Sequence, residues 1–198
     1  HEGAADAEVI ADALAVGPNG LHVLPAPASP ELADYVTTAH LRALLENLSR
    51  SHEMIVADTS RQLNEITLEA AERAERLIVV TDRSVTGVKN TRLLLNVLEV
   101  LHVPDERIVL VVNHREPDDV LQLERSQVDD FLKLPVAIEV PHDSAVGASV
   151  SSGSPIVLHR PESPASLALN ALARLLETGE APELTAPGVR RRRGLFGR

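Results

Sequence analysis

The sequence predicts an α/β protein in which a mostly parallel β-sheet lies between two layers of helices. Apolar runs of strand length alternate with segments of helical period, which is the pattern of β-α-β units. Hydrophobic residues make up 44% of the 198 residues, but the aromatic ones are only Tyr35, Phe131 and Phe196. The core is therefore expected to consist of Leu, Val, Ile and Ala, a composition typical of strands buried on both faces.

Local patterns predict the elements of the first third of the chain. The turn Gly17-Pro-Asn-Gly20 precedes a short strand at Leu21–Pro25. Leucines recur at helical spacing between residues 37 and 51 and predict an amphipathic helix. The apolar run that starts at Met54 ends in Asp58, which predicts a buried strand at Met54–Asp58. A helix is expected to follow from about Leu63 to Ala74.

Strands and helices alternate more regularly in the rest of the chain. Pro104 ends a long amphipathic helix, and Ser163-Pro164 is typical of a helix start, with Ser as the cap and Pro in the first turn. We predict strands at Leu77–Thr81, Ile108–Asn113 and Val136–Val140, and helices at Ser84–Leu101, near Ser126–Leu132 and at about Ser163–Leu176.

We assign residues 1–178 to one partial domain and residues 179–198 to a Pro/Gly linker with a basic tail. The formal net charge is −10, although the last eleven residues contain five arginines and no acidic residue. An acidic body argues against nucleic-acid binding. The chain has no cysteine and no apolar run of membrane-spanning length, which favours a cytoplasmic protein without disulfides or thiolate metal sites.

Polar residues follow four of the predicted strands at the points where the strands end. The carboxyl ends of parallel strands form one edge of a sheet, and ligands bind at that edge in open α/β folds. A carboxylate there can hold the magnesium that bridges phosphates, and an asparagine offers a donor and an acceptor to a purine. A magnesium-nucleotide site is therefore predicted at Asp58-Thr59, Thr81-Asp82, Asn113-His114 and Pro141-His142-Asp143.

The sequence contains no Gly-x-x-x-x-Gly-Lys-Ser/Thr motif that would cradle the phosphates. The segment Gly147–Ser154 comes nearest to the motif, but it has no lysine. The first residue is His and not Met. From these observations we expect that N-terminal strands of the domain, and the phosphate-binding loop with them, are missing.

In their order and spacing, these motifs resemble the MinD/ParA-type (deviant Walker) P-loop ATPases. The resemblance is strongest to the CpaE/TadZ-like branch from Flp (Tad) pilus assembly, and it covers roughly residues 15–178. The matching segments are Leu21–Pro27, Ile55–Thr59, Leu77–Asp82 with Asn90–Leu95, Val111–His114, Val140–Val146 and Gly153–Pro155.

The resemblance implies a three-layer, P-loop NTPase-like fold with ATP and Mg²⁺ as cofactors. Asp58, with Thr59 beside it, corresponds to the family's aspartate near the attacking water and the magnesium, which it binds through water. Asn113 corresponds to the adenine-contacting asparagine, and Pro141, His142 and Asp143 to the turn beside the base. Gln62 stands where the family has a glycine near the γ-phosphate, which argues against efficient hydrolysis.

The family's loop-bearing strand lies at the centre of the sheet, between the strands predicted at Met54–Asp58 and Leu77–Thr81. Residues 1–198 alone are therefore expected to be aggregated or molten and to leave a groove at that place. The implied function is an ATP-binding ATPase domain that positions or assembles a pilus or secretion apparatus through ATP-dependent homodimerisation. The alternative is a degenerate scaffold of the same fold that does not hydrolyse ATP.

Each candidate residue also has a structural interpretation. Asp58 could cap the helix that follows it, and Asn113 could stabilise a turn. Asp82 is expected to cap the long helix and not to touch a ligand. The eight histidines are expected on the surface or in loops, because no spacing of histidines and carboxylates supports a zinc site.

The basic tail has two interpretations of its own. It could contact anionic lipid at the inner face of the membrane, since basic residues there flank two large apolar ones. An unstructured, solubilising end is the alternative. The residues in question are Arg190, Arg191, Arg192, Arg193, Leu195 and Phe196.

Overall fold

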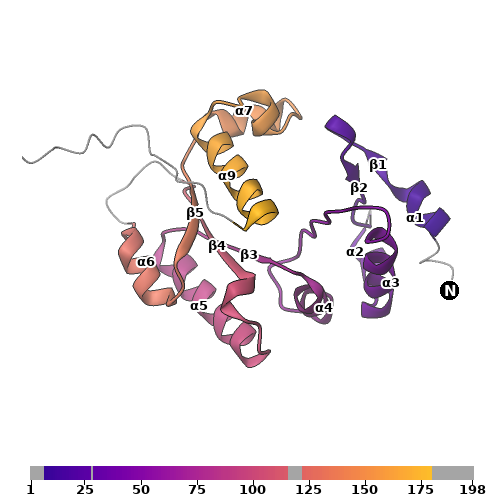
Figure 1. Ribbon diagram of the computed structural model, residues 1–198, viewed down its shortest axis with the longest axis horizontal. Coiled ribbons are helices and arrows are strands. Elements are labelled where there is room, and N and C mark those ends of the chain that lie inside the picture. The colour runs from indigo at the N-terminus through magenta and orange to yellow at the C-terminus, as the bar shows by residue number, and fades with distance from the viewer. Residues whose placement is uncertain (1–6, 28, 116–121, 180–198) are drawn as a thin grey trace, which may run out of the picture. The chain divides into compact units, whose positions relative to one another are not determined.

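The structure, a computed structural model, describes residues 7–27, 29–115 and 122–179. The chain divides into two compact units, residues 1–75 and residues 76–198 (Figure 1). The predicted linker from residue 180 onward and the basic tail lie outside the described residues. Within the described part of the chain, no helix is both long and apolar enough to cross a membrane.

The first unit consists of short helices and a small hairpin. The predicted turn is confirmed, because a 3-10 turn at Pro18–Gly20 joins two strands and Gly20 has a φ of +78°. The strand predicted at 21–25 is shorter than expected and pairs antiparallel with the strand before the turn. The elements are α1 (Ala7–Ala13), β1 (Ala15–Val16), β2 (His22–Val23), α2 (Pro30–Ala33), α3 (Thr38–Leu48) and α4 (Glu65–Arg73).

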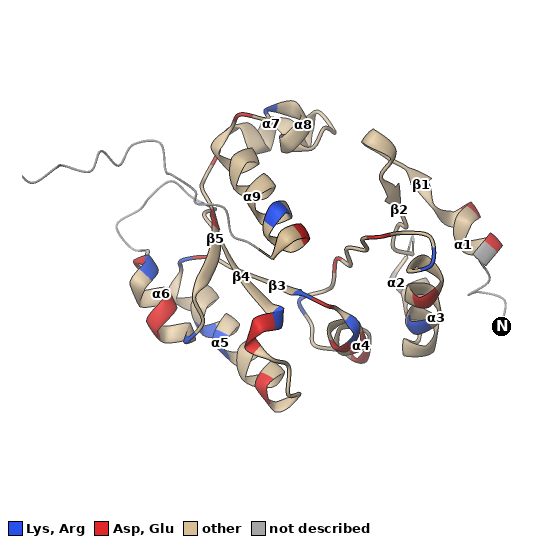
Figure 2. Cartoon of the chain, in the orientation of Figure 1, with Lys and Arg blue, Asp and Glu red and all other residues tan. Residues whose placement is uncertain are grey.

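An ion-pair network joins the helices α3 and α4, which were both predicted. The Glu69 carboxylate on α4 accepts hydrogen bonds from Arg42 on α3, at 2.7 Å, and from Arg73 one turn along α4, at 2.5 Å. The hydrogen bonds from Arg42 and then Arg73 lower the pKa of Glu69 to about 2. Figure 2 shows acidic and basic residues side by side along α4.

The strand predicted at Met54–Asp58 is wrong. These residues carry no strand pairing and are exposed, with Val56 at 75% of its full accessibility. An apolar run has the side chains of a buried strand, but it becomes part of a sheet only when a neighbour pairs with its backbone groups. Among the described residues, Met54–Asp58 has no such neighbour.

The second unit is built on a parallel sheet in the order β3-β4-β5. All three strands lie where the sequence predicts them, and the predicted helices are confirmed to within two residues at each end. The strands are β3 (Leu77–Thr81), β4 (Ile108–Asn113) and β5 (Val136–Val140), and the helices are α5 (Val85–Val100), the 3-10 turn η3 (Asp105–Arg107), α6 (Arg125–Leu132), α7 (Ala145–Ser151), α8 (Ile156–His159) and α9 (Pro164–Thr178).

Aliphatic cores lie on both faces of this sheet. One core joins the sheet to α5 and α6 around Leu110 and Val112, and Leu110 is fully buried. The other joins the opposite face to α9 around Val111 and Ile138. Helices therefore cover both faces of a parallel sheet (Figure 1), which confirms the predicted α/β fold class.

The strand β3 forms an open edge of the sheet. It pairs with β4 on one side, and no described strand pairs with its other side. Val79 and Thr81 are buried toward α5, whereas Ile78 and Val80 are 39% and 59% exposed. An apolar strand with free backbone groups is unusual at a finished sheet edge, because such edges are normally covered or charged.

Candidate functional site

The carboxyl ends of β4 and β5 bring two of the predicted site segments together. Asn113 is the register neighbour of Val140, the residue before Pro141, and the backbone N–H of His114 donates to the Val140 carbonyl at 2.9 Å. The Asn113 side chain is exposed and makes no hydrogen bond within the described part of the chain. Its amide is therefore available to a ligand, whereas a turn-stabilising amide would bond to its own backbone.

The turn Pro141–Asp143 connects β5 to two helix starts. One oxygen of Asp143 accepts from the backbone N–H of Ala145, at 2.9 Å, and the other from that of Ala165, at 3.4 Å. The Ala145 bond, together with a bond from the hydroxyl of Ser163, lowers the pKa of Asp143. Asp143 thus holds the turn in place, and His142 beside it is exposed.

Asp58 and Thr59 lie in the first unit, in the unpaired segment before α4, and both are exposed. The cap of α4 is Asn64, whose side-chain oxygen accepts from the backbone N–H of Thr67 at 2.9 Å. The interpretation of Asp58 as the cap of this helix is therefore wrong. Neither Asp58 nor Thr59 uses its side chain in a hydrogen bond to another described residue.

Asp82 serves the start of α5 indirectly. The cap of α5 is Ser84, which accepts from the backbone N–H of Gly87, and Asp82 accepts from both the backbone N–H and the hydroxyl of Ser84, at 2.9 and 2.5 Å. A Cβ at position 87 would lie 2.1 Å from the Asp82 carboxylate. The prediction that Asp82 caps this helix is therefore wrong, because Ser84 is the cap and Asp82 holds Ser84. Glycine at position 87 leaves room for the Asp82 carboxylate.

A side-chain network beside Asn113 does not follow from any sequence motif. His114 Nε2 lies 2.9 Å from one carboxylate oxygen of Glu139 on β5, and Arg125 at the start of α6 lies 3.2 Å from the other. Arg125 also donates to the carbonyl of Val136 at 2.7 Å. The one signal in the sequence is Glu139 itself, a carboxylate inside an otherwise apolar strand.

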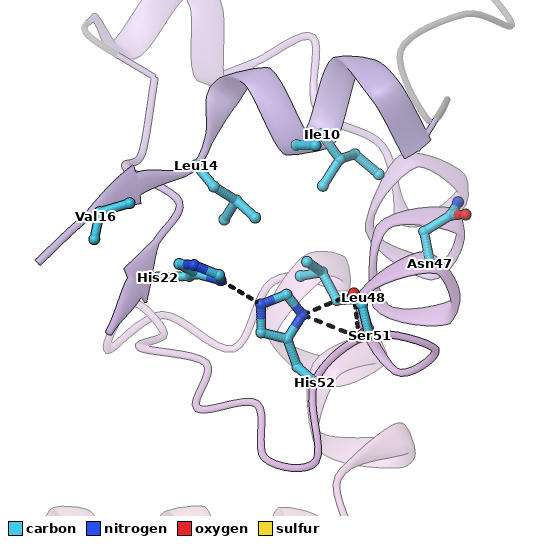
Figure 3. A pocket seen from close by; sticks show the side chains of 9 residues that line it. Ile10, Leu14, Val16, His22, Asn47, Leu48, Ser51 and His52 are labelled. Carbon is cyan, nitrogen blue, oxygen red and sulfur yellow. Dashed lines mark hydrogen bonds between the residues drawn. The ribbon is translucent and has the colours of Figure 1, made fainter. Parts of the chain in front are cut away.

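The first unit contains a pocket of about 320 Å³ with apolar walls and a polar end (Figure 3). Ile10, Leu14 and Leu48 contribute to the walls. At the polar end, His22 Nδ1 and His52 Nε2 lie 2.8 Å apart, so one imidazole donates to the other. Neither histidine was expected to take part in a network, because the two are 30 positions apart in the sequence.

The residues present can be compared with what magnesium and ATP need. No cluster of three or more metal-ligating side chains occurs among the described residues. Mg²⁺ in nucleotide sites is commonly held by one or two carboxylates together with phosphate oxygens and water. A single unengaged carboxylate such as Asp58 fits that requirement, and the exposed amide of Asn113 fits a purine edge.

Curated relatives of this chain are ATP-binding proteins and septum-site proteins. An uncharacterised ATP-binding protein of Methanocaldococcus jannaschii is 27% identical over 167 residues, which cover 84% of this chain and 62% of that protein. The septum site-determining protein MinD of Synechocystis is 28% identical over 167 residues, or 83% of this chain and 62% of MinD. The chain therefore spans less than two thirds of the length of these relatives. No protein-family model matches it.

Solved structures of MinD and ParA proteins have the same fold. A ParA family ATPase from Chlorobium tepidum superposes with a TM-score of 0.77 at 19% identity, over 85% of this chain and 70% of the ATPase. MinD from Pyrococcus horikoshii, solved with Mg-ADP, gives 0.73 at 20% identity, over 87% and 71%. MinD in a MinC:MinD complex from Aquifex aeolicus gives 0.74 at 21% identity, over 90% and 72%.

The structural matches show the fold, which is that of the solved ParA and MinD proteins with their parallel sheet. The sequence relatives and the structural neighbours together support the MinD/ParA-type family of P-loop ATPases for this chain.

Proposed function

We propose that this chain is part of a MinD/ParA-like domain that binds ATP and Mg²⁺ and, in the full-length protein, hydrolyses ATP slowly. In this proposal Asn113 and the turn Pro141–His142–Asp143 contact the adenine. Asp58, with Thr59, acts on the magnesium side and orients the attacking water. When bound, Mg²⁺ neutralises charge that develops on the transferred phosphoryl group.

One observation carries the proposal most strongly. The Asn113 amide lies exposed at the carboxyl edge of a parallel sheet and makes no hydrogen bond to the described residues around it. That edge is where open α/β folds bind ligands, and an amide offers both a donor and an acceptor to a purine. The M. jannaschii relative is described as an ATP-binding protein, and the P. horikoshii MinD was solved with Mg-ADP, which points to the same ligand class.

The phosphates need a cradle that these 198 residues do not encode. We infer that the full-length protein supplies it as a Gly-Lys-Thr or Gly-Lys-Ser loop on a further parallel strand. The open edge of β3, with Ile78 and Val80 exposed, and the unpaired apolar run Met54–Val56 both support a missing strand. The chain covers 62% of the M. jannaschii relative, which leaves room for such a segment.

The biological role is proposed from the resemblance in the sequence. The motifs resemble the CpaE/TadZ-like branch, so we propose that ATP-dependent homodimerisation positions or assembles a pilus or secretion apparatus in the cytoplasm. Peripheral membrane contact through the basic tail is part of this proposal. The proposal includes a specific partner protein, as MinD of A. aeolicus was solved in complex with MinC.

A second candidate is a scaffold of the same fold that has lost hydrolysis. Gln62, where a glycine would approach the γ-phosphate, favours this candidate. The two candidates differ in what they predict for magnesium. An ATPase binds ATP with magnesium-dependent affinity, and a degenerate scaffold does not.

Titration calorimetry on the full-length protein, with Mg-ATP and then with ATP and a chelator, tests the proposal. We expect binding that needs magnesium, together with turnover that falls at least about tenfold in Asp58→Ala. Asn64→Ala is the matched control, because it removes the true cap of α4 and should lower stability without a comparable loss of turnover. Absence of magnesium-dependent binding would favour the scaffold.

A further inference from the structure

Three side chains from different elements form a chain of contacts behind Asn113. His114 at the end of β4 contacts Glu139 on β5 at 2.9 Å, and the second oxygen of Glu139 lies 3.2 Å from Arg125 on α6. His114 is only 10% exposed in its side chain, and Glu139 is 27% exposed. Both oxygens of the carboxylate therefore have a nitrogen partner, and the network runs from the largely buried His114 to Arg125, whose side chain is 55% exposed.

A carboxylate at position 139 is costly unless its partners stabilise it. The other four residues of β5 are apolar, and a charged group in a partly buried strand loses hydration that its partners must replace. An ordinary surface ion pair contributes little to stability and does little to hold its side chains in one geometry. Here the pair joins the ends of two strands and the start of a helix, so its main effect is on geometry.

The network bears directly on the candidate base contacts. His114 follows Asn113 in the chain, and its backbone N–H donates to the carbonyl of Val140, the residue before Pro141. Its side chain is bonded to Glu139, the residue before Val140. Main chain and side chain of His114 are thus both tied to β5, which fixes the peptide that joins Asn113 to His114.

We propose that His114 is a positioning residue for purine recognition, held by Glu139 and, through Glu139, by Arg125. The inference rests on the proposed function, because it requires a nucleotide base at this edge. A base with the wrong donor and acceptor pattern is rejected because it leaves buried polar groups of the site without hydrogen-bond partners. An amide side chain can impose this cost only when its backbone is held in place. Loosening His114 should therefore reduce the preference for adenine over guanine and leave the phosphate contacts intact.

The test measures the affinities of the full-length protein for Mg-ATP and Mg-GTP by calorimetry. We expect His114→Ala to lower the ATP-to-GTP affinity ratio about fivefold to tenfold, through weaker ATP binding. Glu139→Gln keeps an oxygen that can accept from His114 but loses the charge facing Arg125, so a smaller fall in the ratio is expected. Glu69→Gln is the control, since it removes a carboxylate bonded to two arginines in the first unit and should leave the ratio unchanged.

Five outcomes would overturn the inference. If the native protein prefers ATP and His114→Ala keeps that preference, His114 does not position the base contact, although the proposed function stands. Equal affinities of the native protein for ATP and GTP would also show that His114 does not position the base contact. A fall of the ratio in Glu69→Gln as large as that in His114→Ala would show the same. If the native protein binds no Mg-ATP, the proposed function fails and the inference fails with it. Should His114→Ala not fold, an unchanged ratio in Glu139→Gln decides against the inference.

Discussion

The two units of this chain differ sharply in how much they bury. The second unit has two aliphatic cores, one on each face of its sheet, with Leu110 fully buried and Ile138 almost so. In the first unit, Ile10 and Glu69 are the buried residues among those described. Its other large apolar side chains are partly or largely exposed, with Tyr35 and Val56 each at 75%.

The difference teaches that strand-like sequence alone does not stabilise a strand. Ile108–Asn113 and Met54–Asp58 are both apolar runs that end in a polar residue. The first has a paired neighbour on each side and forms the centre of a sheet, whereas the second has none among the described residues. The burial of apolar area, which is the main favourable term in folding, is thus concentrated in the second unit.

Hydrogen exchange should show the largest contrast between the units. The two aliphatic cores of the second unit replace the expectation of a molten 198-residue chain. We now expect the amides of Leu110–Val112 in this chain to exchange at least about a thousandfold more slowly than those of Met54–Val56, because opening β4 requires unfolding of its core. Mass spectrometry of peptides from both runs measures this ratio. Equal protection of the two runs would show that Met54–Val56 has a strand partner.

The next largest contrast is expected in the stability lost when a leucine of each unit is truncated to alanine. Leu110→Ala removes a fully buried side chain and is expected to lower the free energy of unfolding by about 2–5 kcal/mol. Leu32→Ala is the matched change in the first unit, where the side chain is 55% exposed, and should change it by no more than about 0.5 kcal/mol. Urea denaturation followed by circular dichroism gives both values. Similar values for the two variants would contradict the contrast in burial.

Acid should affect the first unit through Glu69. Its pKa in the folded state is about 2, below the ordinary 4.5, so the ionised form is stabilised by Arg42 and Arg73. This contribution is complete above about pH 4.5 and is lost as the pH falls toward 2. We expect the melting temperature of the native chain to fall in that window more steeply than that of Glu69→Gln. Parallel curves for the two proteins would show that the ion pairs add nothing.

The smallest effect concerns the start of α4. Asn64→Ala removes the side-chain cap and is expected to cost about 0.5–2 kcal/mol of stability, whereas Asp58→Ala should be nearly neutral. Thermal melts of the two variants, side by side, check this difference. A larger loss in Asp58→Ala than in Asn64→Ala would restore a structural role to Asp58 and weaken its assignment to magnesium.

Sequence patterns predicted the second unit well because its signals are local. The strands at Leu77–Thr81, Ile108–Asn113 and Val136–Val140 are short apolar runs bounded by turns, and Ser163 with Pro164 starts α9 as expected. The hairpin of β1 with β2 was missed as a pair, because two-residue strands leave almost no pattern. The strand at Met54–Asp58 was predicted wrongly, since pairing depends on a neighbour and not on the run itself.

The candidate site could be predicted only in part. Asn113 and the turn at Pro141 could be singled out because Asn113 is the last residue of β4 and Pro141 directly follows β5. The contacts of Glu139 with His114 and Arg125 join residues 25 and 14 positions apart, and only the fold brings them together. The one signal of this network in the sequence is Glu139, a charged residue in an otherwise apolar strand.

The central claim is that the edge formed by β4 and β5 recognises adenine through Asn113. Calorimetric titration of Mg-ATP into the full-length protein and into Asn113→Ala tests it most directly, with thermal melts to establish that both are folded. We predict one ATP bound per chain and an affinity about tenfold lower in Asn113→Ala, with an unchanged melting temperature of the free protein. Equal affinities for the two proteins would contradict the claim and remove Asn113 from the nucleotide site.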